Sequence, residues 1–545
     1  MMKKEVSKVR AKKTKSREKQ AGKTVPGKIP LKANPIMGLF IAFLLWVLVT
    51  TILSIEHIIQ RTGDPEIIFS LTSDGAFSLL GLFAVGLFLK IVKPEILRKN
   101  SRILLLSLIS LISLILAKTI LYTAETTNWI PEETARFLLL FAFAPLITTI
   151  LVDSTAAVAV GVWTSLVIGL MAGRSLPLFV TGLIATVVTA QAARGIRTRS
   201  KVIRIGIVAG LAEIACVFGF TALHWENPEL MPVLHQAAAC LISGLFSALI
   251  LLMILPAFEA VFQVTTDITL LEWSDLSHPI LQRLAIEAPG TYHHSLLVAS
   301  LAQAAADEIG ANSLLTRVSA YFHDIGKLTK PEFFAENIQL QNNPHDDLLP
   351  SMSTLVITSH VKEGLSLAQL HKLPEVIRKA LREHHGTSLL SYFHHKAKSQ
   401  LEFELDQQNG VQTNGSKKID ESNFRYPGPR PSSRETAIIC LSDAIEAASR
   451  SMKKTTPGNI EGLVNDIVNT RLEDGQLDEC NLTLIDLARI KRSFVFTLTN
   501  MFHGRVPYPE DENRDKQQAK ALSDAHRENK KADKPSDGSG LPTRP

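Results

Sequence analysis

The residues of this sequence with the clearest chemical potential are histidines and aspartates in its second half. The stretch YFHDIGKLTKP places His323 and Asp324 side by side, with Lys327 three residues later. Ten of the sixteen histidines lie between His293 and His395, which is more than packing requires. A two-metal site needs neutral imidazoles as terminal ligands and a carboxylate as a bridge. The series that offers them is His294, His323, Asp324, His360, His384, His385 and Asp443.

Four further histidines carry no acidic partner and follow no recurring pattern. For these residues we expect a structural role, in the core or on the surface. They are His345, His371, His394 and His395.

The residues before this series have the composition of a membrane domain. Residues 36 to about 264 are almost continuously apolar, whereas the rest of the 545-residue chain is mixed polar and charged. Apolar stretches of about 20 residues can cross a hydrocarbon core of about 30 Å as helices. Eight such spans are predicted, near residues 36–55, 76–92, 102–122, 135–152, 154–172, 176–193, 202–222 and 237–262.

The charges of the connecting loops predict the orientation of these spans. Loops rich in lysine and arginine are retained on the cytoplasmic side of a membrane. Eight crossings return the chain to the side of its basic N-terminal tail, so both termini are expected in the cytoplasm. The basic segments are 1–35, 93–102 and 194–204, and the acidic or weakly charged ones are 56–66, 123–134 and 224–230.

Ionisable residues within the predicted spans are few, which argues against a pump. Glu213 and Lys118 are the two that lie deep enough to be considered. A charge within a membrane is a functional candidate, but Glu213 bonded to a neighbouring helix is an equally good interpretation. The first span is expected to be a retained anchor, because its apolar run is long and shows no small-residue cleavage site.

The second half is expected to be all-α. Segments such as 293–310 and 374–385 repeat apolar residues at intervals of three and four. A polar run rich in Asn, Gly, Ser and Pro predicts a flexible insertion at 398–432. The soluble domain is therefore placed at 265–508, followed by a disordered charged tail at 509–545. The four cysteines form no CxxC pair, so neither a disulfide framework nor a thiolate metal site is expected.

The HDIGK run resembles the signature of the HD phosphohydrolase superfamily, whose metal site is built on an adjacent His-Asp pair. APGTYHHS before it (288–295) and HHGTSLL after it (384–390) make the resemblance more specific. From the second span to about residue 508, the chain is similar to the seven-transmembrane HD family, the PgpH-type cyclic di-AMP phosphodiesterases of bacteria. The second histidine pair is followed by GTSLLSYF, and not by the GYP-containing run of the HD enzymes that cut cyclic di-GMP.

The resemblance implies a centre of two divalent metal ions, with iron or manganese expected. Lys327 would contact a phosphate and Asp324 would bridge the metals, whereas a solvated lysine at a helix end is the alternative for Lys327. The pattern favours His294 over His293 as a ligand. The implied ligands are His294, His323, Asp324 and Asp443 for one metal, and Asp324, His360 and His384 for the other, with His385 also in the set.

The implied function is hydrolysis of cyclic di-AMP to pApA at the bacterial inner membrane. Two cations suit this reaction because they bind the nonbridging phosphate oxygens and activate a water. The expected partners are the cyclic dinucleotide and the lipid bilayer, with a homodimer through residues 262–285 left open. No binding of DNA or RNA duplexes is expected.

One departure from the family pattern and two alternatives accompany this prediction. Members usually carry a large extracytoplasmic domain after the first span, where this chain has only the link 56–75.

The first alternative is an HD hydrolase of another nucleotide, such as cyclic di-GMP, a guanosine alarmone or a deoxynucleotide. The second is a receptor with a decayed HD domain, which is disfavoured because no ligand position is lost. A transporter would leave the histidine series without a purpose.

Overall fold

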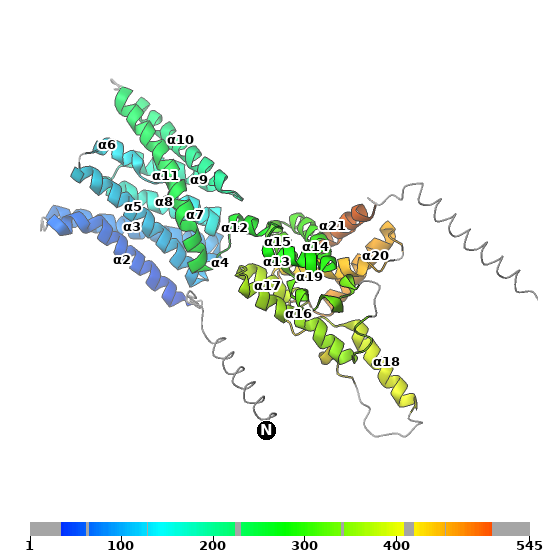
Figure 1. The fold of residues 1–545 in the computed structure, drawn as a ribbon. Coiled ribbons are helices and arrows are strands. Elements are labelled where there is room, and N and C mark those ends of the chain that lie inside the picture. The colour runs from blue at the N-terminus through cyan, green and yellow to red at the C-terminus, as the bar shows by residue number, and fades with distance from the viewer. Residues whose placement is uncertain are drawn as a thin grey trace, which may run out of the picture. The chain divides into compact units, whose positions relative to one another are not determined.

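The protein is helical throughout the part of the chain that the computed structural model describes (Figure 1). Among these residues there is no β-strand, and an isolated antiparallel bridge joins Leu389 and Arg425. The all-α fold predicted from the apolar periodicity is therefore confirmed. The described residues are 34–60, 65–127, 129–223, 230–338, 343–407, 419–452 and 454–503.

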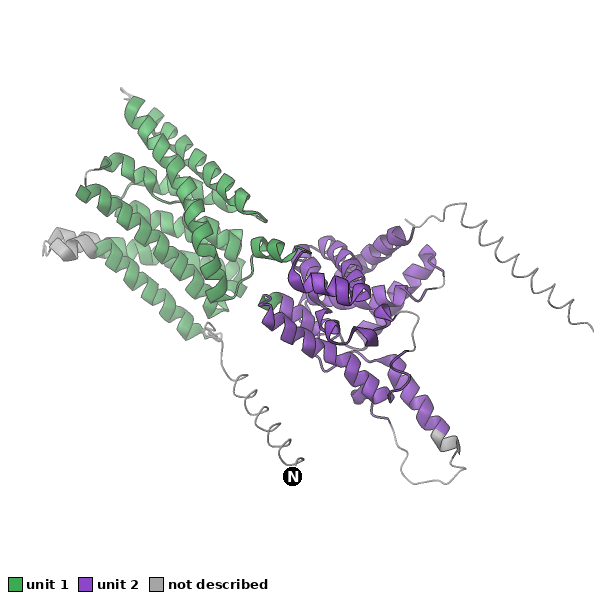
Figure 2. Cartoon of the chain, in the orientation of Figure 1, with its two compact units in different colours: residues 1–276, 374–376 green, residues 277–373, 377–545 purple. Residues whose placement is uncertain are grey.

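The chain divides into two compact units (Figure 2). The first comprises residues 1–276 with 374–376, and the second comprises 277–373 with 377–545. The helices of the first unit are α2 (Pro35–Gln60), α3 (Pro65–Val92), α4 (Pro94–Leu97), α5 (Asn100–Thr127), α6 (Glu132–Ala135), the 3₁₀ turn η1 (Arg136–Leu138), α7 (Phe143–Leu151), α8 (Ser154–Met171), α9 (Leu176–Ala192), α10 (Arg199–Leu223), α11 (Leu230–Phe262) and α12 (Asp267–Trp273).

Seven helical segments in the described part of the chain are long and apolar enough to cross a membrane, so the protein is a multi-pass membrane protein. The sixth predicted span, 176–193, is the apolar helix α9 of 17 residues, about 26 Å long at 1.5 Å per residue. The fourth predicted span is broken. Its chain passes from α6 through η1 and an extended Leu139 before α7 begins at Phe143.

The break in the fourth span is braced by a neighbouring helix. Ser243 of α11 donates a hydrogen bond of 2.7 Å to the carbonyl of Leu139, which satisfies a polar group in an apolar setting. Close packing holds α11 against α10, since a Cβ on Gly244 would lie 2.1 Å from the Gly206 carbonyl oxygen. Glu213, which the sequence marked as a candidate, is buried on α10, and its Oε1 has no hydrogen-bond partner among the described residues.

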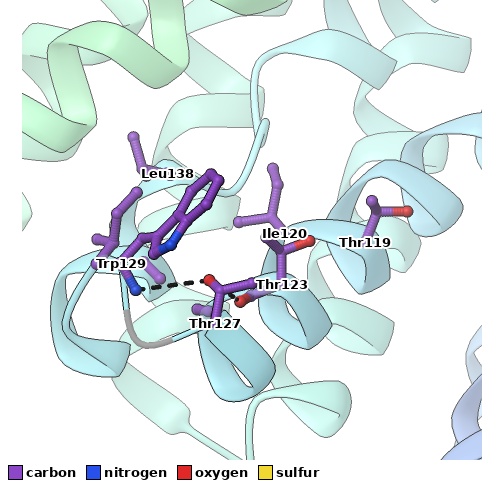
Figure 3. A pocket seen from close by; sticks show the side chains of 9 residues that line it. Thr119, Ile120, Thr123, Thr127, Trp129 and Leu138 are labelled. Atoms are coloured by element: carbon purple, nitrogen blue, oxygen red, sulfur yellow. Dashed lines mark hydrogen bonds between the residues drawn. The ribbon is translucent and has the colours of Figure 1, made fainter.

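An apolar pocket of about 220 Å³ lies at the C-terminal end of α5 (Figure 3). Thr119, Thr123 and Thr127 follow one face of α5, and the exposed Trp129 lies beyond the last of them. The Trp129 amide contacts the Thr127 hydroxyl at 3.5 Å. An exposed tryptophan just beyond a membrane helix is typical of the membrane interface.

The second unit is a helical bundle whose core lies among α14, α19, α20 and α21, with residues such as Val298, Ile438, Val464 and Phe494 fully buried. Its elements are α13 (Pro279–Glu287), α14 (Pro289–Glu308), α15 (Ser313–Phe322), the 3₁₀ turns η2 (Ile325–Thr329), η3 (Pro331–Phe333) and η4 (Ala335–Asn337), α16 (Pro350–Leu370), α17 (Glu375–Glu383), α18 (Ser391–Gln407), the 3₁₀ turn η5 (Glu421–Phe424), α19 (Arg434–Ser449), α20 (Pro457–Glu473) and α21 (Leu484–His503).

The structure differs from the sequence prediction in the region 398–432. Residues 398–407 continue the helix α18, and residues 419–432, which we name the return segment, pack back onto the bundle. Arg425 makes two hydrogen bonds of 2.8 and 3.0 Å to Asp474 and a third, of 2.8 Å, to the Thr387 carbonyl. The polar residues that suggested flexibility are therefore engaged in bonds. The middle of the predicted insertion, 408–418, and the predicted tails 1–33 and 504–545 lie outside the described residues.

Candidate metal centre

The adjacent His323 and Asp324 lie where one helix ends and the next begins. His323 follows the last residue of α15, and Asp324 precedes η2 with φ −110° and ψ 13°. The glycine of the HDIGK run permits a close approach here, because a Cβ on Gly326 would lie 1.9 Å from the His360 carbonyl oxygen. This contact between η2 and α16 brings Asp324 against His360.

The other predicted ligands converge on Asp324 from separate helices. His294 lies on α14, His384 and His385 directly follow α17, and Asp443 lies on α19. The position of Asp443 is fixed by the start of α19, where Ser433 and Thr436 form a capping box.

The seven residues form two groups that share Asp324. Oδ2 of Asp324 lies 3.3 Å from His323 Nε2 and 3.5 Å from His294 Nε2. Its Oδ1 lies 3.4 Å from His360 Nε2 and 3.6 Å from His384 Nε2. Each group could hold a metal ion, since its potential ligand atoms all lie within 4.8 Å of one another. The groups are His294, His323, Asp324 and Asp443, and Asp324, His360, His384 and His385.

The polar atoms at the centre of these groups fit a pair of metal ions. Asp324 is fully buried, and neither of its carboxylate oxygens makes a hydrogen bond of good geometry with a described residue, although the Lys327 ammonium lies 2.7 Å from Oδ2. His323 Nε2 is also buried without such a partner. Burying unsatisfied polar groups costs free energy, so atoms of this kind mark a place where another group binds. Nitrogen and carboxylate donors without thiolate suit divalent transition metals.

The far ring nitrogens of the histidines are held by hydrogen bonds that turn Nε2 toward the centre. Nδ1 of His323 donates to the Ala320 carbonyl at 2.7 Å, and Nδ1 of His360 donates to the Ile357 carbonyl at 2.6 Å. The Nδ1 of His384 similarly lies 3.0 Å from the Leu381 carbonyl oxygen. A donor role for Nδ1 leaves the lone pair on Nε2, which is the form that binds a metal.

Electrostatic environments divide the histidines into two kinds. Burial lowers the pKa of His360 to about 4, and burial beside His384 also holds the pKa of His385 well below its ordinary value. Burial acts in the same direction on His323, but the charge of Asp324 outweighs it and raises the pKa of His323 to about 10. His323 therefore holds a proton that a metal ion must displace, whereas His360 and His385 are neutral near pH 7.

Lys327 lies at the edge of the centre in contact with two carboxylates. Its ammonium is 2.7 Å from Asp324 Oδ2 and 2.7 Å from Glu336 Oε1. The side chain is largely buried yet lines the same cavity as the histidines. The sequence had suggested either a phosphate contact or a solvated lysine, and burial argues against the solvated lysine.

The four histidines for which a structural role was expected belong to neither metal-capable group among the described residues. His345 is buried, with Nε2 2.9 Å from the Phe333 carbonyl oxygen, and His394 packs on Phe424. His371 lies against His278, and His395 is near Ser399.

Sequence reasoning missed three residues that shape the site. Glu446 accepts a short hydrogen bond from His294 Nδ1 and is itself held by Arg450 through two bonds of 2.9 and 2.8 Å. Tyr426, in the return segment, stacks on His385 with ring centroids 4.1 Å apart. Glu446 lies three residues after Asp443, one turn along the same helix, which is a signal that the sequence did contain. No motif in the sequence around Tyr426 indicated that this residue would contact the site.

These residues open onto a cavity of about 980 Å³. Its lining includes His294, Lys327, His360, His385 and Asp443. The cavity is far larger than a hydrated metal pair requires, and its volume falls in the range of small-molecule sites. The arrangement can therefore bind an anionic substrate of nucleotide size beside two metal ions.

Comparisons with known proteins agree with both halves of this structure. Residues 68–266 match the family described as 7TM receptor with intracellular HD hydrolase, and residues 291–448 match the HD domain family. The chain thus contains the two domains of the seven-transmembrane HD family. The resemblance drawn from HDIGK and its flanking sequences is thus confirmed.

Two proteins named cyclic-di-AMP phosphodiesterase PgpH are similar to this chain. The one from Bacillus subtilis is 38% identical over 312 residues, which are 57% of this chain and 42% of that protein. The one from Listeria monocytogenes is 36% identical over 423 residues, which are 76% of this chain and 56% of that protein. The chain therefore spans about half the length of these relatives.

Two solved structures also match the second unit. They are crystal structures of the HD domain of the L. monocytogenes phosphodiesterase PgpH, one of them in complex with cyclic-di-AMP. Each is 40% identical in sequence and covers 42% of this chain, and they are matched over 100% and 99% of their own length. The TM-scores are 0.38 and 0.37.

Proposed function

We propose that this protein is a membrane-bound, metal-dependent phosphodiesterase that hydrolyses cyclic di-AMP to the linear dinucleotide pApA. The observation that carries the proposal is the sharing of Asp324 between two metal-capable groups at the wall of a cavity of nucleotide size. The relatives named cyclic-di-AMP phosphodiesterase support the choice of substrate.

The proposed centre would hold two divalent ions, iron or manganese, with Asp324 available to both. His294, His323 and Asp443 would complete the ligands of one ion, and His360, His384 and His385 those of the other. Bound there, the ions would neutralise the nonbridging oxygens of a phosphodiester and make a water nucleophilic near neutral pH. The P–O bond to the 3′-oxygen breaks as the water oxygen bonds to phosphorus, and the leaving oxygen gains a proton.

The side chains around the centre position these groups. The carbonyls of Ala320 and Ile357 fix the rings of His323 and His360, so the ligands are preorganised. Lys327 is proposed to contact the phosphate, since its ammonium lines the cavity within 2.7 Å of Asp324. Glu336, 2.7 Å from the same ammonium, holds Lys327 at the cavity wall.

The second unit is proposed to face the cytoplasm, with the first unit in the bacterial inner membrane. The positive-inside distribution of the loops supports this orientation. The domain limits 36–264 and 265–508 remain proposals, as does a homodimer formed through residues 262–285.

The test uses the full chain, purified in detergent, loaded with Mn²⁺ or Fe²⁺ under reducing conditions and supplied with cyclic di-AMP or cyclic di-GMP. We expect conversion of cyclic di-AMP to pApA, lost in Asp324→Ala. Asp307→Ala is the matched control, because Asp307 is an exposed aspartate at the end of α14. Two bound ions per chain without cleavage of either substrate would reject the proposal and favour an alarmone or deoxynucleotide. A protein that binds no metal would favour a receptor.

A further inference from the structure

The cavity beside the metal centre has a second wall that the proposed catalysis does not use. This wall is formed by the C-terminal end of α19 and by α20. It presents Arg450, Asp466 and Arg471 to the same cavity of about 980 Å³ that His360 and Asp443 also line. A cyclic dinucleotide has two phosphodiesters, and only one of them can occupy the metal centre at a time.

Three basic residues line the cavity, and two of them are committed to carboxylates. Lys327 contacts Asp324 and Glu336, and Arg450 is bonded twice to Glu446. The third, Arg471, is half-buried in the last turn of α20 and makes no ion pair with any described residue. Asp466, which also lines the cavity from α20, is exposed and is not paired with Arg471. Arg471 is therefore the cation available to a ligand.

We propose that Arg471 binds the second, non-reacting phosphate of the substrate and so selects for a cyclic dinucleotide over a single phosphodiester. This inference rests on the proposed function. A guanidinium binds phosphate through paired N–H donors, and each such charge-assisted bond is stronger than a neutral one. Arg471 lines the same cavity as His360, His385 and Tyr426. The ring of Tyr426 stacks on His385.

The role of Arg471 has a consequence for specificity. The metal centre recognises any phosphodiester, because it contacts only the reacting phosphate. A substrate with a second phosphate gains the Arg471 contact as well. Loss of the guanidinium should therefore weaken binding of the dinucleotide and have little effect on a substrate with one phosphate.

The test compares Arg471→Gln, Arg471→Lys and the unchanged full chain in detergent, loaded with Mn²⁺. Steady-state kinetics are measured on cyclic di-AMP and on bis(p-nitrophenyl) phosphate, which has a single phosphodiester. For Arg471→Gln we expect KM for cyclic di-AMP to rise about tenfold to a hundredfold, in keeping with the strength of a hydrogen bond to a charged group. The rise for bis(p-nitrophenyl) phosphate should be at least ten times smaller, and Arg471→Lys should recover part of the loss.

The matched control is Arg492→Gln, because Arg492 is an exposed arginine on α21 outside the cavity. Mn²⁺ content, measured for every variant, should stay at the value of the unchanged protein. Equal losses on both substrates, or an unchanged KM for cyclic di-AMP, would overturn the role of Arg471. Failure of the unchanged protein to cleave cyclic di-AMP while it cleaves bis(p-nitrophenyl) phosphate would instead overturn the proposed function, and this inference with it.

Discussion

Glu446 shows how much of the candidate site depends on a residue that would touch no metal. It accepts the Nδ1 proton of His294 and thereby turns Nε2 toward Asp324 and Asp443, where a bound metal ion would take its lone pair. We expect Glu446→Gln to lower Mn²⁺ affinity about tenfold to a hundredfold, the usual cost of losing such a partner. Isothermal titration with Mn²⁺ measures the effect. Glu461→Gln, on the exposed face of α20, is the control and should bind Mn²⁺ as the unchanged chain does.

The proton on His323 predicts a pH dependence of metal binding. The charge of Asp324 raises the pKa of His323 to about 10, so this imidazole is protonated near pH 7. A metal ion that takes Nε2 must release the proton, and a lower proton concentration favours that exchange. Mn²⁺ affinity should therefore rise with pH between 6 and 8, about tenfold per unit for each proton displaced. Titrations in buffers of different ionisation enthalpy count the protons, and a flat profile would contradict this assignment.

The candidate ligands could be predicted from the sequence because their residue types stand in short, recognisable motifs. The pair His323 and Asp324 is adjacent, and so is the pair His384 and His385. Tyr426 could not be predicted in this way, because its contact with His385 joins positions separated by the polar run after α18. Only the folded chain brings such residues together.

At the scale of elements, the return segment is the part that differs most from the sequence prediction. Its backbone pairs with the loop after His385, since Tyr426 N donates to the Ser388 carbonyl at 3.0 Å and Leu390 N donates to the Phe424 carbonyl at 2.8 Å. Residues rich in Pro, Gly and Ser have weak helical preferences, so composition alone suggested flexibility. Specific bonds to Asp474 and Thr387 order the segment instead.

Arg425 bonds the return segment to Asp474 and Thr387, so its loss should affect the stability of the whole segment. We expect Arg425→Ala to destabilise the fold by about 1 to 3 kcal/mol, because it leaves Asp474 and the Thr387 carbonyl without their shared partner. The segment should also become more sensitive to limited proteolysis, and Tyr426 should lose its fixed place on His385. Arg430→Ala is the control, since the contacts of Arg430 to Asp478 and Thr387 are longer, at 3.3 and 3.5 Å. Equal protease resistance in both variants would argue against this role for Arg425.

At the scale of the whole molecule, the division into an apolar and a polar half was legible because hydropathy reports directly on the surroundings of a helix. The break in the fourth span could not be predicted from the sequence, because the residues around Leu139 are as apolar as those of an unbroken helix. A break of this kind depends on tertiary partners such as Ser243, which lies more than a hundred residues away. The number of crossings therefore needs a direct test.

The loops at Trp129 and Arg197 provide that test. Both residues are exposed, and three of the predicted spans separate them, including the broken fourth span and the short α9. An odd number of crossings places the two loops on opposite sides of the membrane. If every one of the three crosses, Trp129→Cys should react with a membrane-impermeant maleimide in intact cells, whereas Arg197→Cys should react only after permeabilisation. The four native cysteines are buried and should give little background.

The pattern of labelling would decide the side of the candidate metal centre as well as the number of spans. If α9, at 17 residues, failed to cross while its neighbours did, both positions would be labelled from the same side. Labelling of Arg197→Cys in intact cells, with Trp129→Cys protected, would invert the topology and place the second unit outside the cytoplasm. Such a result would place the candidate metal centre and a cytoplasmic cyclic dinucleotide on opposite sides of the membrane, which contradicts the proposed function. The expected pattern leaves the basic loop 194–204 and the second unit on the cytoplasmic side, where the positive-inside rule places them.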